Sequence, residues 1–204
     1  MTAGRTNRYQ LSLHWGTPRK YVSTIKAFFG GSIELDPCSN PYSVVGAKVE
    51  WMLPNTDGLT QAWTYESIFV NPPYGADRDR GTRIIHWLEK CWEAYDINRS
   101  EVIALVPVAV NTKHWKQYVW PEAAAICFLY DTRVRFLENG LDVGKGSPMA
   151  CCLVYWGTRV DKYCADFAHH GAVVPLEGAT MPNLRPLASD PELRGNLATT
   201  QRRR

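Results

Sequence analysis

Short apolar runs alternate with helical patterns along this chain of 204 residues, and few folds accommodate that order. Residues 67–70, 101–110 and 123–130 are apolar runs of the kind that form buried strands. Between the first two, residues 83–95 repeat apolar side chains at the spacing of an amphipathic helix. Parallel strands need such crossover helices. The sequence therefore predicts an α/β fold, with a mostly parallel, twisted sheet and helices on both faces.

Weaker patterns extend this prediction to both ends of the chain. The remaining expected elements are helices over 21–29 and 161–169, strands over 32–35 and 47–53, and a late antiparallel hairpin that pairs 134–137 with 149–156 across a polar loop. We expect a basic arm over residues 1–13 and one domain over 14–178. From residue 179 onward three prolines and no aromatic residue occur, so we expect a flexible tail over 179–204.

Charge and cysteine content indicate which partner, cellular location and metal content to expect. The net charge is only +3, but residues 1–33 contain five Lys or Arg and no Asp or Glu, which suits a polyanionic partner. No apolar run is long enough to cross a membrane and no secretory signal is visible, so we expect a cytoplasmic protein without a membrane partner. The six cysteines form no C-x-x-C pair, and we expect no metal.

The sequence Asn71-Pro72-Pro73-Tyr74-Gly75 is the most informative motif. It follows the apolar run 67–70, so it lies at the carboxyl end of an expected strand, where open α/β sheets bind ligands. The two prolines stiffen the turn and remove two donors. Two acceptors remain, the Asn71 side-chain oxygen and the Pro72 carbonyl, beside the ring of Tyr74. This set suits a planar group that carries an –NH2, so we predict Asn71, Pro72, Pro73 and Tyr74 as catalytic residues.

A second polar group closes the expected strand 32–35. Asp36 follows this strand and precedes Pro37 and Cys38. At the end of a first strand a carboxylate faces the ligand crevice of a doubly wound sheet and can accept hydrogen bonds from an amino group or a ribose. The structural alternative is a turn that Asp36-Pro37 initiates.

The order of these motifs resembles the phage-type DNA N6-adenine methyltransferases, and the tetrapeptide itself resembles motif IV of amino-methyltransferases. The matching segments are Trp15-Gly16-Thr17-Pro18, Glu34-Leu35-Asp36-Pro37-Cys38, Asp57-Gly58-Leu59 with Trp63, Asn71-Pro72-Pro73-Tyr74, Trp87, Val106-Pro107, Arg133-Val134-Arg135-Phe136 and Ser147-Pro148-Met149. The resemblance covers residues 14–157. It implies a Rossmann-like methyltransferase fold, S-adenosylmethionine as cofactor and double-stranded DNA as partner.

The resemblance also implies residue roles. Those expected at the methyl donor are Trp15, Thr17, Pro18, Asp36, Pro37, Cys38, Asp57 and Asn71. Those expected at the DNA are Tyr74, Lys113, Arg133 and Arg135. One departure is visible, because many methyltransferases carry a glycine-rich turn where this chain has Asp36-Pro37-Cys38-Ser39.

The expected reaction is transfer of a methyl group to the N6 amine of an adenine flipped out of the duplex. Contacts that read the DNA are expected from the loops 75–82, 111–121 and 138–148 and from the arms. Other planar amines remain open as substrates, namely cytosine N4 and a protein glutamine amide. A catalytically silent nucleic-acid-binding module is the alternative from a different class.

Overall fold

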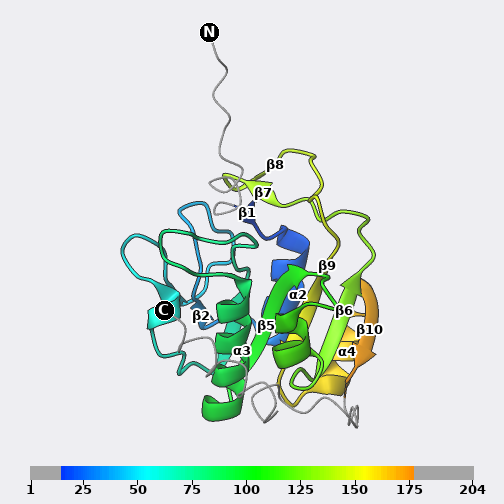
Figure 1. Ribbon diagram of the computed structural model, residues 1–204. Helices are drawn as coiled ribbons and strands as arrows, with labels where there is room; N and C mark the ends of the chain where they lie inside the picture. The colour runs from blue at the N-terminus through cyan, green and yellow to red at the C-terminus, as the bar shows by residue number, and fades with distance from the viewer. Residues whose placement is uncertain (1–14, 177–204) are drawn as a thin grey trace, which may run out of the picture.

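A seven-stranded sheet forms the centre of the computed structural model, which describes residues 15–176 (Figure 1). The expected arm 1–13 and tail 179–204 lie outside the described residues, so that division of the chain stays a prediction. The strand order is β10-β6-β9-β5-β4-β2-β3. The strands are β2 (Leu35–Asp36), β3 (Val49–Glu50), β4 (Ser67–Val70), β5 (Glu101–Pro107), β6 (Ala125–Leu129), β9 (Cys151–Trp156) and β10 (Gly171–Pro175).

Most of this sheet is parallel. β2 runs parallel to β3 and β4, and β4 runs parallel to β5. β9 lies between β5 and β6 and is antiparallel to both, so β6 points the same way as β5. The edge strand β10 is antiparallel to β6. The predicted mostly parallel α/β sheet is thereby confirmed.

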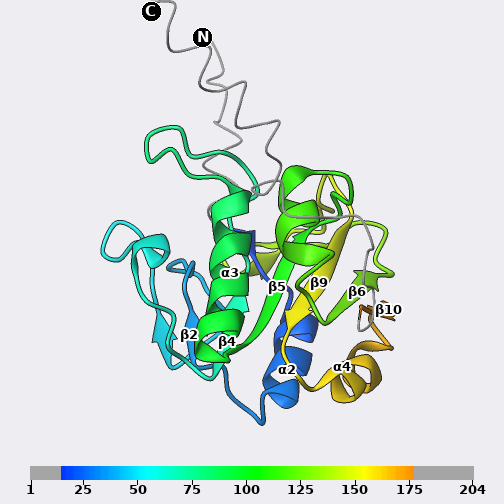
Figure 2. The ribbon, with the colours of Figure 1, turned by 60° about the horizontal axis from the view of Figure 1, so that its bottom comes forward.

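Helices cover both faces of the sheet, as predicted (Figures 1 and 2). They are α2 (Arg19–Phe28), α3 (Ile84–Asn98) and α4 (Val160–Phe167), with the short helical turns η1 (Gly58–Thr60) and η2 (Trp115–Val119). α2 and α4 pack against one face, together with Ile103 and Leu105 of β5. α3 and η2 pack against the other face, together with Val102 and Ala104. The alternation along β5 thus divides the core into two layers.

The predicted hairpin between 134–137 and 149–156 is wrong. All six residues of β9 are buried because alternate side chains enter the two core layers, and β9 pairs with β5 and β6 instead of with 134–137. Leu137 instead belongs to a small antiparallel sheet of β1 (Trp15–Gly16), β7 (Leu137–Glu138) and β8 (Leu141–Asp142). The sequence signal for it is Asn139-Gly140, the preferred pair for a two-residue hairpin turn.

Candidate active site

The carboxyl ends of β2 and β4 bring the two halves of the predicted site together. Leu35 of β2 lies opposite Ile68 of β4, so the chain segments that follow both strands run side by side. Burial raises the pKa of the Cys38 thiol, and the nearby backbone N–H of Asn71 counteracts this shift. The Asp36-Pro37-Cys38 turn and the Asn71-Pro72-Pro73-Tyr74 turn therefore border one another, as a parallel sheet requires.

The side chain of Asn71 is held in one orientation by the small sheet. Its Nδ2 atom donates a hydrogen bond of 2.9 Å to the carbonyl oxygen of Trp15. A carbonyl can only accept, so the amide nitrogen must face Trp15. The Asn71 Oδ1 atom consequently points away from Trp15 as a pre-oriented acceptor. The Trp15 backbone was not expected to have this role, and a contact across 56 positions of the sequence leaves no local signal.

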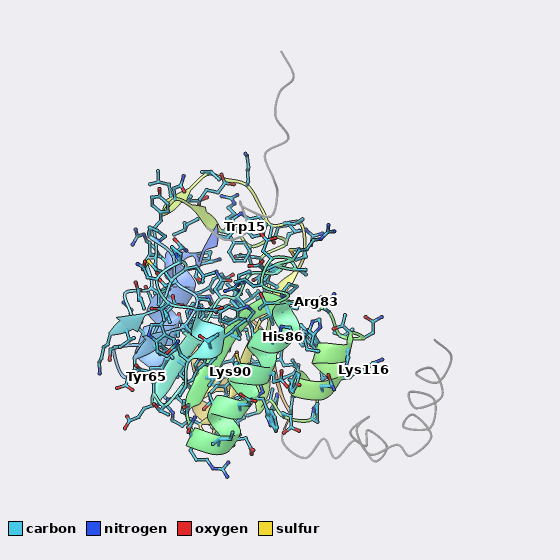
Figure 3. The ribbon with its side chains drawn as sticks, turned by 60° about the vertical axis from the view of Figure 1, so that its left-hand side comes forward. Trp15, Tyr65, Arg83, His86, Lys90 and Lys116 are labelled. Carbon is cyan, nitrogen blue, oxygen red and sulfur yellow. The ribbon has the colours of Figure 1, made fainter. Side chains whose placement is uncertain are left out.

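Tyr74 is an aromatic anchor beneath the small sheet. Its hydroxyl donates to the carbonyl oxygen of Leu105 at 3.2 Å. Its ring lies edge-on to Trp15 and to Phe136, at centroid distances of 6.5 and 5.8 Å, while those two rings stack on each other at 5.3 Å. Burial raises the pKa of Tyr74 well above its usual value, so the phenol stays neutral. In Figure 3 Trp15 lies above His86 and Lys90 of α3.

Asp36 is a buried carboxylate. Its side chain is only 4% exposed, and Oδ1 accepts a hydrogen bond of 3.1 Å from the Cys38 N–H. This contact is the turn that the structural alternative predicted, and it coexists with the burial. Desolvation raises the pKa of Asp36 from 3.8 to about 7, although the Cys38 N–H counteracts it. A carboxyl group perturbed in this way beside a pocket is a candidate for a functional site.

A pocket of about 130 Å³ opens next to this turn. Four of the predicted residues line it, namely Pro37, Cys38, Asp57 and Pro73. Its other lining residues are Ser39, Asn40, Pro41, Trp51, Met52, Leu53, Thr56, Gly58, Arg80 and Trp87. A Cβ atom on Gly58 would lie 1.9 Å from the Pro37 carbonyl oxygen, so only glycine permits this approach of η1 to the turn.

Arg80 is a pocket residue that the motifs did not predict. It forms ion pairs with Asp57 at 2.9 Å and with Asp77 at 2.8 Å. The second oxygen of Asp57 accepts from the Leu59 N–H at 3.0 Å and begins η1. Both oxygens of Asp57 therefore already have partners. No sequence pattern links positions 57 and 80, because the pairing depends on how the loop over 77–82 folds back on the pocket.

Two further polar groups lie at the carboxyl edge. Thr17 is 1% exposed, and its Oγ1 atom has no hydrogen-bond partner among residues 15–176. Glu50 ends β3 and accepts from the Ala47 N–H at 3.2 Å. The predicted strand 47–53 extended past Glu50, and this concealed that an acidic residue ends the strand as Asp36 ends β2.

A second, larger cleft lies between the start of α2 and the loops around the small sheet. Three predicted residues line it: Arg133 and Arg135, expected at the DNA, and Pro18, which was expected at the methyl donor and does not line the first pocket. Arg19 and Lys20 join them, and Lys20 pairs with Asp131 at 2.7 Å. Lys113 is exposed in the turn after β5 and lines neither of these two hollows.

These observations define a class of protein before any comparison. They place this chain among the open α/β sheet proteins, which bind their ligands in the crevice outside the carboxyl ends of the strands, where Asn71 and Asp36 lie. The family model described as DNA N-6-adenine-methyltransferase (Dam) matches residues 6–163, which is most of the chain. The chain therefore belongs to the Dam family of DNA N6-adenine methyltransferases, and the resemblance seen in the sequence is confirmed.

The other comparisons add no relative. No curated protein and no solved structure matches the chain. Within residues 15–176, no helix is long and apolar enough to span a membrane. The same part of the chain holds no group of three or more His, Cys, Asp or Glu side chains placed to bind a metal ion.

Proposed function

We propose that this protein transfers a methyl group from S-adenosylmethionine to the N6 amine of an adenine flipped out of duplex DNA. Family membership supports adenine-N6 methylation of DNA. The observation that carries the proposal for this chain is the orientation of Asn71, whose amide nitrogen is bound by the Trp15 carbonyl and whose Oδ1 stays available. We also assign the sheet to the Rossmann-like methyltransferase class, which its parallel order and late antiparallel strand β9 support.

The residues present fit the cofactor. S-adenosylmethionine, when bound, supplies a methyl group on a positively charged sulfonium. Asp36 would face the positive charges of this molecule, and Thr17 Oγ1 is a buried polar atom without a partner that could hydrogen-bond its amino-acid end. The mostly apolar pocket beside Pro37 and Gly58 would hold its adenine, with Trp51 in the wall.

Asn71 and Pro72 would prepare the substrate amine. The lone pair of an exocyclic nitrogen is delocalised into the ring, so the amine is a weak nucleophile. Hydrogen bonds from its two N–H groups to Asn71 Oδ1 and to the Pro72 carbonyl favour a pyramidal nitrogen with an available lone pair. As the new N–C bond forms and the S–C bond breaks, the surplus proton leaves N6 for water. Catalysis then rests on alignment and electrostatics.

The first test removes the oriented acceptor. We expect Asn71→Ala to lower the rate of methyl transfer to DNA by at least about a hundredfold, the effect of losing one preorganised group in comparable sites. Donor binding, measured by calorimetry with S-adenosylmethionine, should survive within about threefold, because Asp36 and the pocket are untouched. Ile97→Ala, on an exposed position of α3, serves as the control. Normal turnover by Asn71→Ala would contradict the assignment.

Sequencing of methylated bases in DNA from cells that express the chain tests the substrate. We expect N6-methyladenine in a short sequence context. Methylation at cytosine N4 alone, or of a protein acceptor alone, would show that the proposed substrate is wrong.

A further inference from the structure

The loop over residues 77–82 follows the catalytic turn Asn71-Pro72-Pro73-Tyr74 and is closed on itself. Asp77 and Thr82 form an antiparallel bridge, in which each N–H donates to the carbonyl of the other, at 2.9 and 3.0 Å. The Asp77 Oδ1 atom also accepts from the Arg80 N–H at 3.1 Å. The loop is therefore a compact unit whose position can be set by a single attachment to the rest of the molecule.

The Arg80 side chain attaches this loop to the first pocket, which we assigned to the methyl donor. Its Nε atom donates to Asp77 Oδ2 at 2.8 Å, and its Nη2 atom donates to Thr82 Oγ1 at 3.1 Å. Its Nη1 atom lies 2.9 Å from Asp57 Oδ2, and the two side chains are only 22% and 25% exposed, so solvent ions screen this pair less than a surface ion pair. Both Arg80 and Asp57 line the pocket, so the pair joins the loop to the donor site.

One donor atom of Arg80 still lacks an acceptor. Nη1 is buried, and within residues 15–176 it forms no hydrogen bond, because its contact with Asp57 has the distance of an ion pair without the angle of a hydrogen bond. A buried donor without an acceptor costs free energy. A molecule in the pocket that Arg80 lines can supply this acceptor, so a filled pocket favours the observed position of Arg80 and of its loop.

The carboxyl end of the catalytic turn depends on this attachment. Tyr74 packs against the core, and Trp87 of α3 is the next buried residue along the chain. None of residues 75–86 is buried. Arg80 fastens this stretch to the same pocket that Pro73 of the turn lines. Loss of the Arg80 contacts would therefore allow the end of the turn to shift relative to the pocket.

We propose that Arg80 is a positioning residue for methyl transfer, which pairs with Asp57 to fix the catalytic turn to the donor pocket and so keeps Asn71 aligned with the methyl donor. This inference rests on the proposed function and deepens it by a residue outside the motif. Arg80 acts through Asn71 and does not touch the reacting atoms. Such alignment is sensitive, because a displacement of about 1 Å can lower a rate about a hundredfold.

The test measures Arg80→Leu in two backgrounds, wild type and Asn71→Ala. The rate is single-turnover methyl transfer from labelled S-adenosylmethionine to one duplex, with the context found methylated in cells and both substrates saturating. In the wild-type background we expect Arg80→Leu to lower this rate about tenfold. In the Asn71→Ala background it should lower the rate by less than about twofold, because the group that Arg80 positions is already absent. A purely structural role would instead give equal losses in both backgrounds.

A conservative variant and a matched control complete the design. Arg80→Lys retains the charge that pairs with Asp57 and should be faster than Arg80→Leu, although it lacks the planar fork of arginine. Arg159→Leu removes a comparable ion pair, with Glu101 at 2.9 Å, from the amino end of β5. It should match wild type within about twofold, because distant sites act independently. Thermal unfolding checks that each variant is folded.

Three results would overturn the role of Arg80 while the proposed function stands. They are equal losses for Arg80→Leu in both backgrounds, an unchanged rate in the wild-type background, and an Arg80→Lys enzyme as slow as Arg80→Leu. A loss in Arg159→Leu as large as in Arg80→Leu would do the same. If wild type transfers no methyl group to DNA, the proposed function fails and this inference fails with it.

Discussion

At the scale of the residue, Tyr74 shows how a motif side chain can have a structural role besides its predicted one. The sequence predicts a ring on which the adenine stacks. In the structure the ring is half-buried, wedged edge-on against Trp15 and Phe136, and its hydroxyl is bound to the Leu105 carbonyl. A stacking role therefore requires that the adenine reach the part of the Tyr74 ring that stays exposed. The hydroxyl contact with Leu105 meanwhile holds the catalytic turn against β5.

These two roles of Tyr74 predict that three substitutions will differ in their effects on activity and stability. Tyr74→Phe loses only the hydroxyl contact, worth about 1 kcal/mol of stability, and should keep most of the activity. Tyr74→Leu keeps an apolar side chain but has no π-face, so it should raise KM for DNA with a smaller loss of stability than Tyr74→Ala. Tyr74→Ala adds a cavity and should be about 2–4 kcal/mol less stable. Steady-state kinetics and urea unfolding separate these effects. A Tyr74→Leu enzyme with normal KM and kcat would remove the stacking role.

At the scale of the element, the chain from β6 to β9 contributes both to the large sheet and to the basic cleft. β9 fills the gap between β5 and β6 and is buried throughout. The segment before it therefore has no place in the large sheet. It forms the small sheet with β1, and its outer loops carry Arg133 and Arg135 at the cleft. The predicted basic segment thus lies next to the start of α2, which contributes Arg19.

The salt dependence of DNA binding tests this basic cleft. Each phosphate contact contributes a slope of about −0.9 to the dependence of log K on log salt concentration. We expect Arg133→Ala and Arg135→Ala each to make that slope about one unit less steep, measured by fluorescence anisotropy with a fixed duplex. Lys48→Ala, which removes an exposed lysine paired with Glu34 away from the cleft, should leave the slope unchanged. An unchanged slope in both arginine variants would show that the cleft does not bind phosphates.

At the scale of the whole molecule, the site lies along the seam where both core layers reach the carboxyl edge of the sheet. Tyr74 packs with the layer of α2 and α4, whereas Cys38 packs with the layer of α3. Asp36 is also buried, and its burial affects the stability of the entire fold. Between pH 4 and 7 the folded state holds a proton on Asp36 that the unfolded state releases. This group therefore makes the protein less stable as pH rises through that window.

Asp36→Asn should separate stability from function. The amide oxygen can still accept from the Cys38 N–H, but no charge is buried. We expect the variant to be more stable than wild type at pH 8, by up to about 4 kcal/mol, with a smaller difference at pH 5. Its affinity for S-adenosylmethionine should fall, and it should lack the weakening below pH 7 that we expect for wild type. Urea unfolding and calorimetry across this range provide the measurements.

Asp96→Asn, at an exposed position of α3, is the control for this series and should change neither quantity. A difference in stability that does not depend on pH would show that Asp36 is not a buried ionisable group of the kind described.

The sequence alone determined those features of this protein that depend on local patterns of residues. The strands β4 and β5, the helix α3 between them and the position of Asn71-Pro72-Pro73-Tyr74 at a strand end follow from local periodicity and burial, so they were predictable. Local patterns record whether a segment is buried, but not which distant segment covers it. Only the tertiary structure decided that β9 enters the sheet between β5 and β6, that Arg80 reaches Asp57, and that the Trp15 carbonyl orients Asn71, because each contact joins segments that no spacing in the sequence relates.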